Sequence, residues 1–158
     1  MLLNRIAAST AVVALIFMLV ALPGCGRQGA APPAAVKAGQ VDDARLNALD
    51  ADNWLAHGGN QQAHRYSPLD QINVDTVANL KPAWSLDVDT YRGQEATPIV
   101  VDGVAYITTA WSKVSAVDAT TGNALWQFHP KVPGPHAAKN CCDVVNRGVA
   151  VYRGKVYV

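Results

Sequence analysis

Residues 98–107 read PIVVDGVAYI, and a stretch with the same pattern of residue types, VAVYRGKVYV, follows 51 residues later at residues 149–158. Each copy consists of an apolar run, a charged residue followed by glycine, and a second apolar run that contains tyrosine. This pattern predicts a tight hairpin, because glycine tolerates the positive φ angle that such turns require. A hairpin that recurs at this period indicates a propeller or a solenoid.

Two further strands are predicted after the first hairpin. Apolar residues dominate residues 114–117 and 124–128, and the stretch TTGN at residues 120–123 predicts a turn between them. Short antiparallel strands that follow one another within about thirty residues have the spacing of a propeller blade.

The residues ahead of the hairpin predict a helix, a loop and one more strand. A short amphipathic helix is expected between Val41 and Leu49, followed by an ordered loop over the polar residues 56–73. Apolar and polar residues then alternate from Leu80 to Val88, which predicts a strand with one buried face.

The first residues have the pattern of an export signal. Arg5 precedes the uncharged apolar residues 7–22, a run too short for a comfortable membrane span, and small residues follow it. The stretch LPGC at residues 22–25 also resembles a lipobox, in which Cys25 would be acylated. Ordinary signal cleavage and an uncleaved anchor remain alternatives. All three export the chain, so we expect a periplasmic protein, with Cys25 as the candidate membrane tether.

The chain therefore divides into four parts. Residues 1–24 are the leader, residues 25–40 a flexible linker rich in Pro, Ala and Gly, and residues 41–79 the N-terminal helix with its following loop. Residues 80–158 form the start of a propeller, about its first one to two blades. Because the sequence stops inside a predicted strand, we expect an N-terminal fragment of a longer protein, inactive on its own.

Composition excludes some function classes. The net charge is +1 with both signs interspersed, so the chain has no basic stripe for nucleic acid. No Cys-x-x-Cys-His run for covalent haem is present. His57, His64, His129 and His136 have spacings that match no familiar metal site.

Cys141 and Cys142 are neighbours in the sequence. Adjacent Cα atoms lie about 3.8 Å apart, closer than in most disulfides, so a bond between them would close a small ring. Two free or separately paired thiols are the ordinary interpretation of such a pair. Export favours the bond, because the periplasm is oxidising and only these two thiols remain if Cys25 is lipidated or removed.

Glu95 and Arg147 both lie just before the first strand of their repeats. Equivalent loops of a propeller open onto the same end of its channel, so we expect these opposite charges to face a common mouth. Either one alone would be interpreted as a solvated loop charge.

The second turn carries a longer motif. Its residues resemble the tryptophan-docking motif of the quinoprotein propellers, in which the Trp packs between blades, the Asp and Thr fasten the turn and the Gly permits it. The matching residues are Ala116, Asp118, Thr121, Gly122 and Trp126.

Three more segments are similar to those of the pyrroloquinoline-quinone (PQQ) dependent alcohol dehydrogenases. They are QEATP at residues 94–98, CCDVVNRG at residues 141–148, and the stretch from WLAHGGN to RYSPL at residues 54–69. The resemblance runs from about Trp54 to the last residue, and the motifs follow the family's order.

The resemblance implies an all-β, eight-bladed propeller that holds PQQ in its central channel. Cys141 and Cys142 would form a disulfide plate against PQQ, Arg147 would hydrogen-bond its quinone carbonyl region, and Glu95 would hold a polar edge. Such enzymes oxidise a primary alcohol or related substrate and pass electrons to a cytochrome or a quinone. The family's catalytic aspartate and Ca²⁺ ligands lie in later blades, and a haem c domain would follow them, so we expect no catalytic or metal-binding residue here.

A non-catalytic propeller is the alternative function. The scaffold lipoprotein of outer-membrane barrel assembly shares the docking motif and a lipobox, but a scaffold has no use for a cofactor plate. Cys141 and Cys142 together with Glu95 and Arg147 therefore favour the dehydrogenase.

Overall fold

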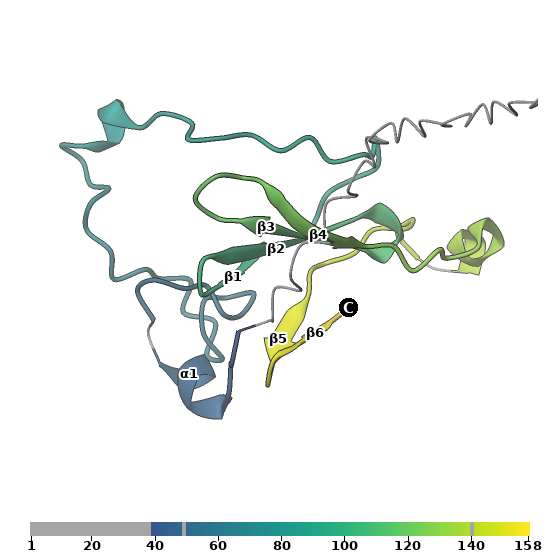
Figure 1. The fold of residues 1–158 in the computed structure, drawn as a ribbon, viewed down its shortest axis with the longest axis horizontal. Coiled ribbons are helices and arrows are strands. Elements are labelled where there is room, and N and C mark those ends of the chain that lie inside the picture. Colours follow the sequence, from purple (N-terminus) through teal and green to yellow (C-terminus); the bar gives the residue numbers. More distant parts are fainter. Residues whose placement is uncertain (1–38, 49, 140) are drawn as a thin grey trace, which may run out of the picture. The chain divides into compact units, whose positions relative to one another are not determined.

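The computed structural model of the chain describes residues 39–48, 50–139 and 141–158. The predicted leader and lipidation site, and residues 25–38 of the predicted linker, lie outside them. The described residues form a four-stranded antiparallel sheet in the order β1-β2-β3-β4 and a two-stranded hairpin of β5 and β6 (Figure 1). Within this part of the chain, no helix has the length and apolar character needed to cross a membrane.

Short connections join β1 to β4, and a longer one with a 3₁₀ turn leads from β4 to β5. In chain order they are α1 (Asp43–Asn47), a 3₁₀ turn (Val77–Asn79), β1 (Ile99–Val101), β2 (Val104–Thr109), a 3₁₀ turn (Ala110–Ser112), β3 (Lys113–Asp118), β4 (Ala124–Phe128), a 3₁₀ turn (Gly134–Lys139), β5 (Ala150–Tyr152) and β6 (Lys155–Tyr157).

The two hairpins predicted from the repeat are confirmed, and their loops have the same length. The pairing of β1 with β2 leaves Asp102-Gly103 as the loop, and the pairing of β5 with β6 leaves Arg153-Gly154. The φ angles are 50° and 78° in the first loop and 46° and 72° in the second. Positive φ at both positions is the type I′ geometry, whose twist matches that of the flanking strands. The 51-residue repeat of the sequence is therefore also a repeat of the structure.

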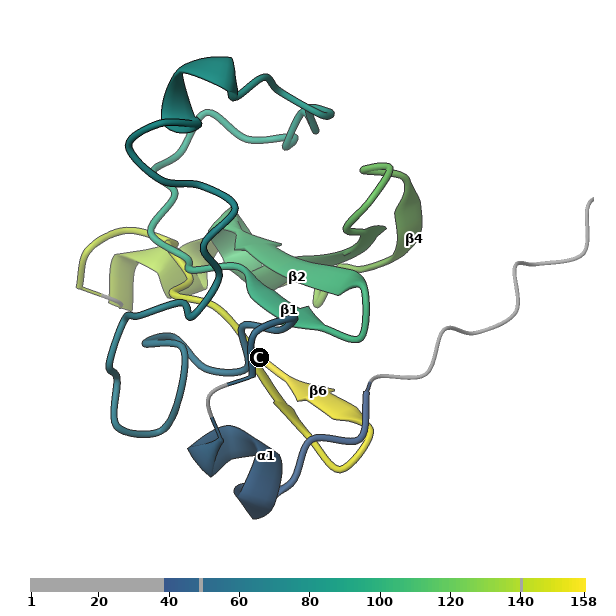
Figure 2. The same cartoon turned by 90° about the vertical axis from the view of Figure 1, so that its left-hand side faces the viewer.

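The N-terminal segment joins the two hairpins. Val41 is fully buried, and its carbonyl oxygen accepts a hydrogen bond of 2.8 Å from the backbone N–H of Arg153. Arg45 of α1 forms an ion pair of 3.0 Å with Asp102 in the loop between β1 and β2, and this contact raises the pKa of Arg45. Both views show α1 beside the β5–β6 hairpin (Figures 1 and 2). The helix is shorter than predicted: it begins after Asp42, whose side chain caps it.

The hydrophobic core lies between the four-stranded sheet, the N-terminal segment and the β5–β6 hairpin. Its buried members come from the N-terminal segment, from β1 to β3 and from β5: Val41, Leu55, Ile99, Val101, Val104, Tyr106, Ala116 and Val151. The second hairpin therefore packs on the first unit of the repeat through apolar contacts, as successive propeller blades do.

The strand predicted between Leu80 and Val88 is wrong. The alternation is present only in the later part of the segment, where Trp84, Leu86 and Val88 are half-buried and the residues between them are exposed; Leu80 and Pro82 are exposed. A strand also needs a hydrogen-bonded neighbour, and the described residues place none beside this segment. It is held instead by a side chain, because the indole N–H of Trp84 donates to the carbonyl oxygen of Ala119 at 3.0 Å.

The turn after β3 is fastened by its own side chains. The Asp118 carboxylate accepts the backbone N–H groups of Thr120 at 2.9 Å and of Thr121 at 2.8 Å, and these bonds lower the pKa of Asp118. Gly122 has a φ of 75°. A Cβ atom at Gly122 would lie 2.6 Å from the ring of Trp84, so this position requires glycine for two separate reasons.

Trp126 of β4 points toward the second hairpin. Its ring centroid lies 6.0 Å from that of Tyr106, and it packs as a half-buried residue against the core. Trp126 and Phe128 line one side of an apolar cavity of about 620 Å³, and Val156 and Tyr157 of β6 line the other. The tryptophan of the docking motif thus lies between the first sheet and the second hairpin.

Candidate cofactor site

Glu95 and Arg147 meet, although 52 residues separate them. Glu95 lies in the segment that leads into β1, and Arg147 lies in the equivalent segment before β5. The Arg147 Nε–H donates to Glu95 Oε2 at 3.1 Å, and the two side chains are 71% and 45% exposed. Of the Arg147 nitrogens, only Nε is engaged within the described residues, so the two terminal nitrogens remain available to an oxygen ligand.

Cys141 and Cys142 are exposed, and the charges of this ion pair act on the Cys141 thiol. The pKa of the Cys141 thiol is raised, chiefly by its hydrogen bond with Cys142, while Arg147 opposes the rise and Glu95 adds to it. Both charges therefore lie within electrostatic range of the thiol. The two sulfurs are present as thiols, so the disulfide expected from the sequence is not formed in this structure. The disulfide between these neighbouring residues stays a prediction for the oxidised protein.

The turn that follows the cysteines is anchored on the loop after β2. Val144 is buried, and its carbonyl oxygen accepts the N–H of Trp111 at 2.8 Å. The Asn146 amide donates to the Ser112 hydroxyl at 3.0 Å and accepts from the Gly148 N–H at 2.9 Å. Sequence reasoning missed Trp111 and Ser112, whose short loop carries no motif of its own.

A second ion pair lies on the same turn. Arg92 Nη1 donates to both carboxylate oxygens of Asp143 at 2.7 Å, which lowers the pKa of Asp143. One feature of the sequence indicated this contact: Arg92 and Asp143 are 51 residues apart and so occupy the same position in their repeats. Like Glu95 and Arg147, they are opposite charges on equivalent loops.

The leading loop supports the segment that carries Glu95. Arg65 Nη2 lies 2.8 Å from His57 Nε2, and Thr97 Oγ1 lies 2.9 Å from His57 Nδ1. A guanidinium only donates, so Nε2 accepts and Nδ1 carries the proton that is donated to Thr97. On the other side, Gly148 has a φ of 124°, and a Cβ there would lie 3.3 Å from the carbonyl oxygen of Thr97. Thr97 is therefore held from both sides, two residues after Glu95.

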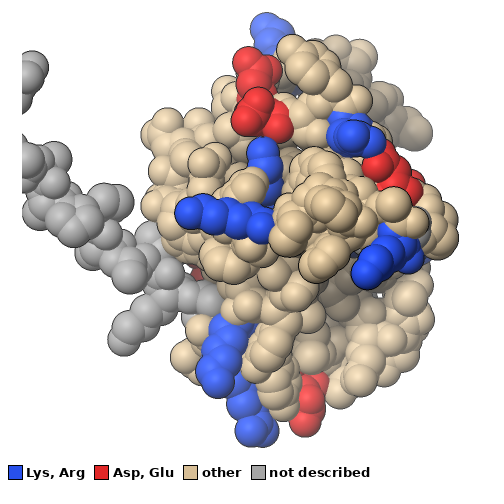
Figure 3. All heavy atoms as spheres, turned by 90° about the vertical axis from the view of Figure 1, so that its right-hand side faces the viewer, with Lys and Arg blue, Asp and Glu red and all other residues tan. Residues whose placement is uncertain are grey.

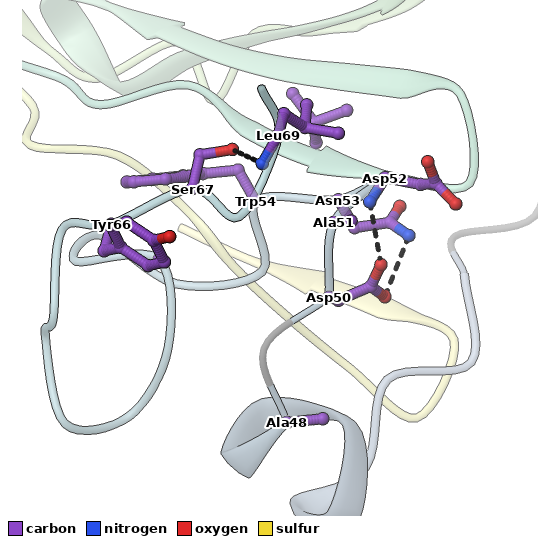
Figure 4. A pocket seen from close by; sticks show the side chains of 11 residues that line it. Ala48, Asp50, Ala51, Asp52, Asn53, Trp54, Tyr66, Ser67 and Leu69 are labelled. Atoms are coloured by element: carbon purple, nitrogen blue, oxygen red, sulfur yellow. Dashed lines mark hydrogen bonds between the residues drawn. The ribbon is translucent and has the colours of Figure 1, made fainter. Parts of the chain in front are cut away.

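Another cavity, of about 220 Å³, is formed by the leading loop (Figure 4). Trp54, Tyr66 and Asp50 contribute to its wall, and none of the predicted cofactor residues does.

The face drawn in Figure 3 carries Lys and Arg side chains next to Asp and Glu side chains. Within residues 39–48, 50–139 and 141–158, no cluster of three or more His, Cys, Asp or Glu residues could hold a metal ion.

The chain matches a known family of propeller domains. The PQQ family model, described as "Glucose/ethanol/alcohol dehydrogenase, beta-propeller domain", matches residues 54–157. The chain belongs to this PQQ propeller family. The predicted β-propeller class is thereby confirmed, and the four strands β1–β4 correspond to a blade of the PQQ propeller.

Individual PQQ propeller proteins are similar over most of the chain. The "Alcohol dehydrogenase (quinone), dehydrogenase subunit" of Komagataeibacter europaeus is 56% identical over 120 residues, which are 75% of this chain and 16% of that protein. The crystal structure of the quinohemoprotein alcohol dehydrogenase from Comamonas testosteroni matches with a TM-score of 0.71 and 46% identity, over 75% of this chain and 18% of that one. A europium-containing methanol dehydrogenase matches with a TM-score of 0.63 and 36% identity, over 68% of this chain and 19% of that one. The chain thus spans less than a fifth of these PQQ proteins.

The residues gathered here fit PQQ, which is a planar, acidic quinone. The free guanidinium nitrogens of Arg147 suit its oxygen atoms, and Glu95 fixes the remaining nitrogen of the same side chain. The exposed sulfurs of Cys141 and Cys142 offer a polarisable surface beside them. The site therefore contains a cation, a carboxylate and an apolar surface within one small area.

Proposed function

We propose that this chain forms the quinone-contacting part of a periplasmic PQQ-dependent dehydrogenase that oxidises alcohols. The observation that carries the proposal is the ion pair of Glu95 and Arg147 beside Cys141 and Cys142. Four side chains from two repeats converge there, and a propeller without a cofactor needs none of them in this arrangement.

When bound, PQQ supplies the redox chemistry by taking two electrons from the alcohol. The residues of the chain bind and orient it. Arg147 would hold a fixed positive charge near the quinone oxygens, and an aimed donor of this kind acts most strongly at the transition state. Glu95 holds Arg147 by Nε and so directs its terminal nitrogens. Cys141 and Cys142, once bonded, form a rigid surface for one face of the ring.

The names of the relatives support the wider assignment. The "1-butanol dehydrogenase (cytochrome c)" of Thauera butanivorans is 52% identical over 105 residues. With the quinone-linked relative above, it supports an alcohol as the substrate and a cytochrome c or a quinone as the electron acceptor. We further propose that Ca²⁺ is bound by residues outside this chain, that a haem c domain accompanies some longer forms, and that Cys25 is the site of any membrane tether.

A graft protein tests this function. In the graft, residues 54–157 of this chain replace the matching segment of the Comamonas testosteroni enzyme, so that every residue tested comes from this sequence. We expect alcohol-dependent dye reduction that requires added PQQ, because Glu95, Cys141, Cys142 and Arg147 complete the cofactor site.

The matched control is the graft with Cys141→Ala and Cys142→Ala, which keeps the ion pair and removes the sulfur surface. We expect this variant to hold PQQ more weakly than the parent graft. A folded parent graft that takes up no PQQ would contradict the proposed function and leave the scaffold interpretation in its place.

A further inference from the structure

The turn that carries the cysteines is conformationally demanding. Cys142 and Asp143 have φ angles of 70° and 65°, in the left-handed region that non-glycine residues avoid. Such a conformation persists only where surrounding contacts hold it. Contacts of Val144 and Asn146 hold the later half of the turn, so the earlier half, which contains the cysteines, needs another support.

Arg92 provides that support from the equivalent loop of the preceding repeat. One nitrogen, Nη1, bridges both carboxylate oxygens of Asp143 at 2.7 Å. The guanidinium carbon of Arg92 also lies 5.9 Å from the ring centroid of Trp111, within the range of a cation–π contact. Trp111 in turn binds the carbonyl of Val144 through its backbone N–H. Arg92 thus connects the two halves of the turn.

We propose that Arg92 is a positioning residue for the cysteine pair: by fixing Asp143, it holds Cys141 and Cys142 in the turn from which they bond to each other and face Arg147. The inference rests on the proposed function, because it takes the bonded pair as the surface against which PQQ lies. Arg92 itself touches neither the sulfurs nor the charges of Glu95 and Arg147 in the described contacts.

The chemistry is ordinary thiol–disulfide exchange with a low-molecular-weight disulfide such as oxidised glutathione as the oxidant. One cysteine thiolate attacks a sulfur of oxidised glutathione, forms a mixed disulfide and releases one glutathione. The second thiolate attacks the protein sulfur of that mixed disulfide and releases the second glutathione. Two electrons pass from the cysteines to glutathione, and the two thiol protons end on the released glutathione molecules. The second step depends on how closely the two cysteines are held.

The test is the thiol–disulfide equilibrium of the full chain in buffers of fixed glutathione ratio. Acid quenching, alkylation and mass spectrometry give the bonded fraction at Cys141 and Cys142. We expect Arg92→Ala to lower the equilibrium constant for the bond about fivefold, which is the upper range for an ion pair this exposed. Asp143→Asn should have a similar effect, because asparagine keeps the preference for left-handed φ and removes only the charge.

Two controls separate positioning from general stability. Arg92→Lys should stay within about twofold of the parent, because a single ammonium can bridge both carboxylate oxygens as Nη1 does. Arg153→Ala removes the same side chain from the β5–β6 loop, where it lies against Tyr152, and should leave the equilibrium unchanged. In urea all variants should coincide, because the ion pair exists only in the folded chain.

The inference would be overturned if Arg92→Ala and Asp143→Asn both had the same equilibrium constant for the disulfide as the parent. A shift of that constant that persists in urea would overturn it as well. The proposed function fails by a different result, namely a graft that takes up no PQQ. A redox shift in the full chain without PQQ uptake by the graft would therefore support the role of Arg92 and reject the cofactor.

Discussion

Arg147→Ala in the PQQ-loaded graft should lower alcohol-dependent turnover about a hundredfold to a thousandfold, while PQQ content stays close to that of the parent graft. In the proposed site the cysteine surface and several polar groups would hold PQQ, so the loss of one of them would leave most of the binding. The guanidinium would act mainly on charge that appears as the quinone is reduced. Its exposed terminal nitrogens, free of partners in the described residues, are placed for that task.

Two further variants sharpen this prediction. Arg147→Lys should recover little activity, because an ammonium cannot donate to Glu95 and to PQQ with the geometry of a guanidinium. Glu95→Gln keeps an oxygen that accepts from Arg147 Nε, so its loss of turnover should be smaller than that of Arg147→Ala. Dye reduction gives turnover and absorbance gives PQQ content. Near-normal turnover of PQQ-loaded Arg147→Ala would show that Arg147 is only a loop charge.

Gly122→Ala should destabilise the full chain by about 2–4 kcal/mol. Two causes add at this position. The φ of 75° is unfavourable for any residue with a Cβ, and that Cβ would lie 2.6 Å from the ring of Trp84. Trp84 can move aside only by giving up its hydrogen bond to Ala119. Urea unfolding followed by tryptophan fluorescence gives the difference in the free energy of unfolding.

Gly103 is the matched control for Gly122. Its φ is 78°, but no atom lies within 4 Å of the Cβ that alanine would add. Gly103→Ala should therefore show only the backbone effect, about 1–2 kcal/mol. In a Trp84→Ala background, Gly122→Ala should cost no more than Gly103→Ala does. Equal effects of the two single substitutions in the parent chain would show that the contact with Trp84 plays no part.

The hairpins could be predicted from the sequence because their cause is local. Asp102-Gly103 and Arg153-Gly154 lie between apolar runs, and a two-residue loop with positive φ needs little beyond those residues. The segment from Leu80 to Val88 shows the limit of this reasoning. Its alternation correctly predicted that Trp84, Leu86 and Val88 are half-buried but was wrong for Leu80 and Pro82, which are exposed. A strand also depends on a neighbouring chain that a local pattern does not contain.

The candidate site shows the same division between local and long-range information. The repeat predicted that Glu95 and Arg147 face a common mouth, because equivalent loops open on the same side, and in the structure the two side chains are hydrogen-bonded. The same offset relates Arg92 to Asp143, and the contact was missed because neither residue belongs to a motif that marks a cofactor site. The left-handed conformation of Cys142 could not be predicted, since the turn that contains it is held by long-range contacts, among them the ion pair of Asp143 with Arg92.

A crystal structure of the graft soaked with PQQ would show the proposed contacts directly. We expect PQQ with one face against bonded Cys141 and Cys142, an oxygen within hydrogen-bond distance of the Arg147 guanidinium, and Glu95 on the same edge. PQQ bound elsewhere in a folded graft, or no PQQ in the presence of an intact Glu95–Arg147 pair, would contradict it.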